Sequence, residues 1–80
     1  MQLLDTPNPS AKKLLIKHEQ NSGENLDISN FESHEIEYKL LNIDGIDSIF
    51  VGPDFYTILK NSDADWNDIL KDINNFLDKI

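Results

Sequence analysis

The 80-residue sequence contains no cysteine. This absence excludes disulfides, zinc-thiolate sites, a thiol nucleophile and cysteine-ligated metal clusters within these residues. Arginine is absent as well, and seven lysines stand against fifteen acidic residues, for a formal net charge of -8. Because such a surface repels phosphate backbones and anionic lipid headgroups, neither nucleic acid nor a membrane is an expected partner.

Long apolar runs and glycine clusters are also missing. No stretch approaches the about 20 apolar residues of a membrane-spanning helix, and residues 1–5 lack the basic start and apolar core of a secretory signal. The three glycines, Gly23, Gly45 and Gly52, are isolated, so no phosphate-binding loop is expected. We therefore expect a soluble cytoplasmic protein without a nucleotide site.

Apolar residues are present in periodic groups, which predicts a folded chain. The chain is shorter than the usual domain of about 100 to 150 residues, so residues 1–80 are predicted to form one domain. Residues 6–10 (Thr-Pro-Asn-Pro-Ser) form a rigid turn between Leu3-Leu4 and a strand-like pattern over 11–18. This arrangement predicts a β-hairpin.

The polar segment 19–30 is expected to be a loop, and whether residues 25–28 add a short edge strand stays open. Beyond this loop, Ile36, Leu40 and Ile43 recur at helical spacing. Ser33 is a suitable N-cap and Gly45 a suitable terminator, so a helix is predicted between them.

The second half of the chain repeats this order. Residues 46–52 and 55–60 are rich in β-branched and aromatic side chains and flank a turn at Gly52-Pro53-Asp54, which predicts a second hairpin. A last helix is predicted behind a Ser62 cap, with apolar residues at the 3.6-residue period: Trp66, Ile69, Leu70, Ile73, Phe76, Leu77 and Ile80. The ββαββα order predicts an α+β fold, a two-layer α/β sandwich with a mainly antiparallel sheet and two helices on one face.

The predicted strands carry large apolar side chains on both faces. Phe50 must point away from the side to which Ile49 and Val51 point, and residues 55–59 (Phe-Tyr-Thr-Ile-Leu) are mixed in the same way. Leu15 is similarly opposed to its two neighbours. Two helices can cover only one face, so the other is predicted to be apolar and to bind a protein. The alternative is that segment 19–30 folds over it.

A calcium site is a weak possibility in this sequence. Asp63, Asp65 and Asn67 match the first three ligand positions of a calcium loop. However, Asp68 stands where a glycine is needed and Asn74 where a bidentate glutamate is needed. We therefore interpret these carboxylates as residues at the start of a helix.

No catalytic group is specified either. His18 and His34 lack the spacing of a metal-binding pair and are expected at the surface. Nothing in the sequence brings a serine, a histidine and a carboxylate together, so a hydrolase is a remote alternative. The chain is not expected to be an enzyme.

Several short motifs follow one another along the chain in a defined order. Thr6-Pro7-Asn8-Pro9 is followed by Lys13 and an apolar residue, by residues 40–46 (Leu-Leu-Asn-Ile-Asp-Gly-Ile) and 49–55 (Ile-Phe-Val-Gly-Pro-Asp-Phe), and by Thr57, Lys60 and Trp66. This set resembles the N-terminal domain of Nfu/NifU-type iron-sulfur scaffold proteins over nearly the whole chain. The departures are Ser33-His34 where the family often has Ser-Pro, Lys12 for the usual Leu, and Leu14 for a frequent Phe.

The resemblance implies a two-layer α/β domain that normally precedes a second domain, in which a Cys-x-x-Cys pair holds a 4Fe-4S cluster between subunits. These 80 residues contain no such pair, so no cofactor is expected on this chain. The implied partners are apo iron-sulfur proteins, other assembly factors and the protein's own C-terminal domain.

We therefore hypothesise a non-catalytic interaction domain that helps to deliver iron-sulfur clusters. The candidate partner-binding residues are Pro7, Asn8, Pro9, Lys13, Phe50, Asp54, Phe55 and Tyr56. The alternative is an acidic nucleic-acid mimic or regulatory binding protein unrelated to iron-sulfur assembly. A mimic would need carboxylates spaced like phosphates on one surface.

Overall fold

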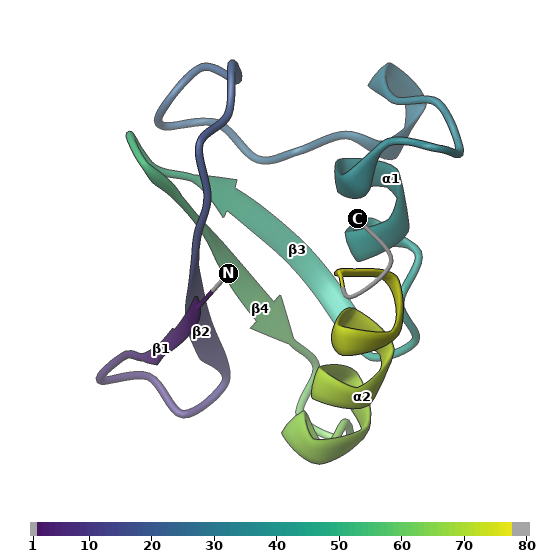
Figure 1. The fold of residues 1–80 in the computed structure, drawn as a ribbon. Coiled ribbons are helices and arrows are strands. Elements are labelled where there is room, and N and C mark those ends of the chain that lie inside the picture. Colours follow the sequence, from purple (N-terminus) through teal and green to yellow (C-terminus); the bar gives the residue numbers. More distant parts are fainter. Residues whose placement is uncertain (1, 78–80) are drawn as a thin grey trace.

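The computed structural model describes residues 2–77, and its elements follow the predicted order (Figure 1). They are β1 (Gln2–Asp5), β2 (Ala11–Leu15), the 3-10 helix η1 (Ile28–Asn30), α1 (Ile36–Leu41), β3 (Ile46–Val51), β4 (Phe55–Lys60) and α2 (Trp66–Leu77). The predicted ββαββα order is therefore confirmed, with η1 added in the long loop.

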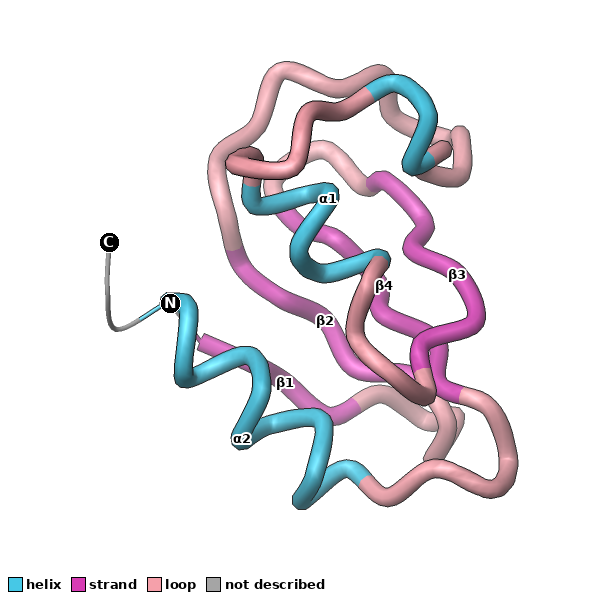
Figure 2. Tube along the Cα trace, turned by 90° about the vertical axis from the view of Figure 1, so that its right-hand side faces the viewer, coloured by secondary structure: helices cyan, strands magenta, loops and turns pink. Residues whose placement is uncertain are grey.

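The four strands form one sheet in the order β1-β2-β4-β3, and every neighbouring pair is antiparallel. Leu14 of β2 lies opposite Tyr56 of β4, which in turn lies opposite Val51 of β3. Side chains that are directly opposite one another share a face of the sheet. Figure 2, which views the molecule from the helix side, shows α1 and α2 in front of the strands. The predicted two-layer arrangement is confirmed.

The core fills the space between the sheet and the two helices. Its fully buried members come from β2, β3, β4, the α1 region and α2, and they include Leu14, Ile49, Val51, Tyr56, Ile58, Leu40, Ile69 and Ile73. Removing one such side chain from water contributes about 1.5 to 3 kcal/mol. All of the sheet residues in this group lie on the same face, which places both helices on that face.

Helix α1 is shorter than the sequence predicts. Its N-cap is Glu35, and the Glu35 carboxylate accepts a hydrogen bond from the Glu32 N–H at 2.8 Å. Ser33, the predicted cap, lies in the preceding turn. The helix also ends at Leu41, before Gly45, which adopts φ +98 just ahead of β3. The predicted end was wrong because the hydrophobic period continues to Ile43, beyond the last helical residue, and the predicted start was wrong because Ser33 belongs to a turn ahead of Ile36.

Helix α2 begins one turn later than its predicted cap. The Asp65 carboxylate accepts a hydrogen bond from the Asn67 N–H at 2.9 Å, so Asp65 caps the helix and Ser62 lies in a turn. The Trp66 indole N–H donates to the Pro9 carbonyl at 2.8 Å and ties the β1–β2 turn to the helix start. The predicted apolar positions 76, 77 and 80 fall outside the described side chains. Neither α1 nor α2, the α-helices of residues 2–77, is long and apolar enough to cross a membrane.

The outer edge of β3 is covered by a segment whose strand character the sequence left open. Asn25 forms an isolated antiparallel bridge with Phe50. Three backbone hydrogen bonds join this segment to β3: Gly23 N–H to Val51 O at 2.9 Å, Val51 N–H to Glu24 O at 2.8 Å, and Leu26 N–H to Ile49 O at 2.8 Å. Residues 23–26 thus act as a short fifth strand on that edge.

Candidate protein-binding face

The face of the sheet opposite the helices is largely apolar. The strand register assigns it the side chains of Leu4, Ala11, Lys13, Leu15, Ser48, Phe50, Phe55, Thr57 and Leu59, which we name the open face. Lys13 is the only charged residue in this set, and no carboxylate belongs to it. The prediction that apolar residues occupy both faces of the sheet is confirmed.

The open face remains accessible to a partner. Phe50 is 45% exposed, and Leu4 and Leu15 are each 38% exposed. These are three of the four large exposed hydrophobic residues among those described, and the fourth is Ile28 of η1. Segment 19–30 does not cover them, because its residues 23–26 pair along the β3 edge and Leu26 packs against the core on the helix side. The alternative in which this loop covers the face is therefore not what the structure shows.

Phe55 is held in place by two contacts. A Cβ atom added to Gly52 would come within 2.3 Å of the Phe55 ring, so the ring lies directly against the Gly52 backbone. The Lys13 ammonium also lies 4.6 Å from the ring centroid, within the range of a cation–π interaction. The ring is therefore fixed before any partner arrives, which lowers the entropy lost on binding.

The structure brings only some of the candidate residues together. Lys13, Phe50 and Phe55 share the open face, and the exposed Asp54 lies beside them at the tip of the β3–β4 hairpin. The turn of Pro7, Asn8 and Pro9 is also exposed, but it lies at the other end of the sheet (Figure 1). The length of β2 separates the two groups, about 16 Å at the usual rise of a strand.

Tyr56 lies on the opposite face of the sheet, the face that the helices cover. Its prediction as an accessible partner-binding residue was therefore wrong. It is fully buried among the core residues, and its hydroxyl donates to the Glu37 carboxylate at 2.7 Å. The sequence indicated that residues of this strand alternate between faces but did not indicate which ones face the helices. The side chain of Tyr56 cannot reach a partner while the core is intact.

His18 supports Tyr56 and is not a free surface residue, contrary to the prediction. Its ring stacks on the Tyr56 ring with centroids 4.7 Å apart. Its Nδ1 accepts a hydrogen bond from the Gln20 N–H at 3.0 Å, so the proton is on Nε2, which donates to the Gly52 carbonyl at 2.6 Å. The polar residues around His18 in the sequence carry no signal of this contact. His34 is exposed, as predicted.

The Tyr56 hydroxyl is expected to make the free energy of unfolding fall at alkaline pH. Burial, followed by the hydrogen bond to Glu37, raises the pKa of Tyr56 above its usual range. Ionisation is then easier in the unfolded chain, so the stabilisation is present below about pH 10 and is lost as the pH rises further. Tyr56→Phe should lower the free energy of unfolding at pH 7 by about 1 to 2 kcal/mol and flatten its decline above pH 10.

Urea unfolding between pH 7 and pH 11 measures both effects. Tyr38→Phe is the matched control, because Tyr38 is only partly buried on α1 and should leave the alkaline decline in place. A Tyr56→Phe variant with the same alkaline decline as the parent chain would contradict this role for the hydroxyl.

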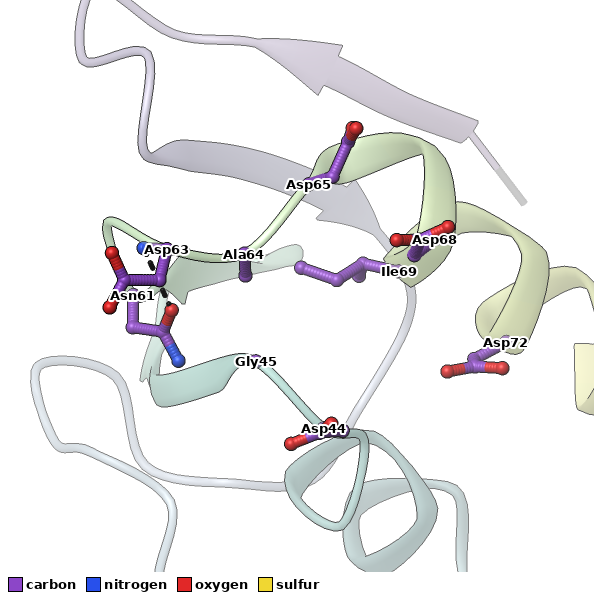
Figure 3. Close-up of a pocket in the computed structure, with 9 residues that line it drawn as sticks. All are labelled: Asp44, Gly45, Asn61, Asp63, Ala64, Asp65, Asp68, Ile69 and Asp72. Atoms are coloured by element: carbon purple, nitrogen blue, oxygen red, sulfur yellow. Dashed lines mark hydrogen bonds between the residues drawn. The ribbon is translucent and has the colours of Figure 1, made fainter.

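An acidic hollow of about 370 Å³ lies between the start of α2 and the turn at Asp44 and Gly45 (Figure 3). Five aspartates line it: Asp44, Asp63, Asp65, Asp68 and Asp72. The carboxylate of Asp65 caps α2, which confirms the helix-start interpretation for this residue. The lining residues include no lysine, so the hollow repels anions.

Comparisons with known proteins identify the family of this chain. The family described as "Scaffold protein Nfu/NifU N terminal" matches residues 1–80. The human protein "NFU1 iron-sulfur cluster scaffold homolog, mitochondrial" is 35% identical in an alignment of 78 residues that covers 91% of this chain and 30% of the human protein. "Conserved virulence factor C" of Staphylococcus aureus is 34% identical in an alignment of 70 residues that covers 85% of this chain and 19% of that protein. The chain therefore spans less than a third of either relative.

Two solved structures share the fold. A crystal structure of protein SAV1430 from Staphylococcus aureus superposes with a TM-score of 0.70 at 20% identity and covers 96% of this chain and 95% of its own. A solution NMR structure of protein SeR13 from Staphylococcus epidermidis superposes with a TM-score of 0.68 at 27% identity and covers 99% of this chain and 94% of its own. From the fold and the match over all 80 residues, we conclude that the chain belongs to the Nfu/NifU N-terminal domain family of scaffold proteins.

Proposed function

We propose that this domain is a non-catalytic protein-binding module that helps an iron-sulfur scaffold to deliver clusters to apo-proteins. The observation that carries the proposal is the exposed apolar open face on a member of a scaffold family. The partners would be apo iron-sulfur proteins, other assembly factors and a cluster-binding domain of the Nfu type. Family membership does not favour the alternative of an acidic mimic of nucleic acid.

The cluster is cargo in this proposal and is not bound by these residues. Iron-sulfur clusters are held by cysteine thiolates, and the chain has no cysteine. The residues present therefore do not fit a cluster, and the contribution of the domain is contact with other proteins. The cytoplasmic location stays a prediction, and the human relative is named as mitochondrial.

The energetics of the open face suit such a contact. Three large side chains, Leu4, Leu15 and Phe50, are 38 to 45% exposed on it, and Phe55 beside them is partly exposed. Covering apolar surface contributes about 25 cal/mol for each square ångström removed from water. A few large side chains that lose their water on binding commonly carry most of the binding energy, which singles out Phe50 and Phe55 on this face.

Phe50→Ser should weaken partner binding at least about tenfold, because it removes the most exposed aromatic side chain of the open face. The probes are an apo 4Fe-4S protein and a cluster-binding Nfu domain, each added to the isotopically labelled chain and followed by NMR. The expected shifts lie on β2, β3 and β4. Because Phe50 is exposed, the variant should retain its fold and its thermal midpoint.

Ile28→Ser is the matched control, since Ile28 is similarly exposed at 38% but lies on η1, away from the open face. It should bind like the parent chain. Shifts confined to α2 and the acidic hollow, or an equal loss of affinity in both variants, would reject the open face as the contact.

A further inference from the structure

Resting on the proposed function, we infer that the open face binds an amphipathic helix of a partner protein, and that this helix places a carboxylate over Lys13. The inference starts from the position of Lys13. In the sheet it lies between Leu4 on one side and Thr57 on the other, with Phe50 beyond Thr57. Its ammonium group therefore lies in the middle of an apolar surface.

Lys13 differs from its neighbour Lys12, which points to the helix side of the sheet. Lys12 forms an ion pair with Asp5 and also lies over the Trp66 ring. No carboxylate is within salt-bridge distance of Lys13 in the part of the chain that the structure describes, and its ammonium group lies over the Phe55 ring. The charge of Lys13 is therefore available to a partner.

A partner that covers the open face must also deal with this charge. A wholly apolar partner would remove the ammonium group from water without giving it an anion, which is strongly unfavourable. A carboxylate placed over Lys13 replaces the lost hydration with a charge-assisted hydrogen bond. The combination of apolar side chains and one carboxylate is the chemistry that fits this face.

The shape of the face selects a helix as the occupant. Four strands at the usual spacing make a sheet about 14 Å wide, and six residues make a strand about 20 Å long. A helix is about 10 Å across, and about 14 residues reach 20 Å. An added strand would instead pair at an edge, where it leaves the side chains of the open face uncovered.

The net charge of the chain makes this inference easy to test. At -8 the chain as a whole attracts basic peptides and repels acidic ones. A preference for an acidic helix therefore runs against the long-range field and must come from a local contact. Binding driven by the acidic hollow would show the reverse preference.

The experiment uses three helical peptides of about 14 residues with the same Leu and Ala stripe, which differ only in Glu, Gln or Lys at its centre. Each is titrated into the labelled full chain and followed by NMR. The Glu peptide should shift open-face residues of β2, β3 and β4 and bind at least about fivefold more tightly than the Gln and Lys peptides. Lys13→Met should abolish this preference, and Lys13→Glu should reverse it in favour of the Lys peptide.

Lys39→Met is the matched control, because Lys39 is exposed on α1 in the other layer, and it should leave the preference unchanged. The inference is overturned if the Lys peptide binds as tightly as the Glu peptide, or if the preference survives Lys13→Met. If Phe50→Ser still weakens client binding at least about tenfold in either case, the proposed function stands without this inference. If neither clients nor peptides shift the open face, the proposed contact face itself fails.

Discussion

Ile58→Ala should lower the free energy of unfolding by about 2 to 5 kcal/mol. Ile58 is 0% exposed in the middle of β4, opposite Ile49 of β3, and it belongs to the core that joins the sheet to both helices. A domain of this size has a total stability of only about 4 to 12 kcal/mol, so the loss is a large fraction of the total. Urea unfolding followed by the fluorescence of the single tryptophan, Trp66, measures the loss.

Leu59→Ala is the matched control for Ile58→Ala. Leu59 is the next residue of β4 but faces the open side of the sheet and is only partly buried. The same truncation should therefore lower the free energy of unfolding by only about 1 to 2 kcal/mol, because less apolar surface is returned to water. Equal losses at the two positions would contradict the assignment of the two faces.

Gly45→Ala should lower the free energy of unfolding by about 2 to 4 kcal/mol, from two causes that add. Gly45 has φ +98, a conformation that residues with a side chain rarely adopt. In addition, a Cβ atom there would lie 2.7 Å from the Ala64 Cβ, in the tight approach between the start of β3 and the segment before α2. The same urea titration reports the loss.

Gly23→Ala separates the two causes. Gly23 has a similar φ of +90, but a Cβ atom at this position would meet nothing within 4 Å. Only the backbone cost of about 1 to 2 kcal/mol should remain. If both variants lose the same free energy, the close approach between Gly45 and Ala64 contributes nothing.

The elements that the sequence predicted well are those with strong local signals. Ile69 and Ile73 follow the helical period and are both buried, and Gly52-Pro53-Asp54 forms the predicted turn between β3 and β4. The apolar open face could also be predicted, because neighbouring apolar residues in a strand must point to opposite sides. That argument needs no knowledge of which strand pairs with which.

The sequence-based predictions failed where two nearby residues could each cap a helix, or where a contact between distant segments determines the direction of a side chain. Ser33 and Ser62 are good helix caps by type, but both lie in turns, and the N-caps are Glu35, which makes no side-chain cap hydrogen bond, and Asp65, whose carboxylate accepts from the Asn67 N–H. The burial of Tyr56 depends on the register between β2 and β4, segments far apart in the chain. Of the candidate binding residues, Lys13, Phe50 and Phe55 share the open face, whereas Tyr56 faces the core, a direction that only the register determines.

The backbone pairing of residues 23–26 along β3 has a consequence for self-association. Uncovered strand edges are the places where sheets of different molecules join and grow into fibrils. Because residues 23–26 occupy that side of β3, the exposed edges of the described sheet are β1 on one side and this short segment on the other. Very short edge strands are poor templates for pairing, and β1 has only four residues, so the folded domain offers another molecule little backbone with which to extend the sheet.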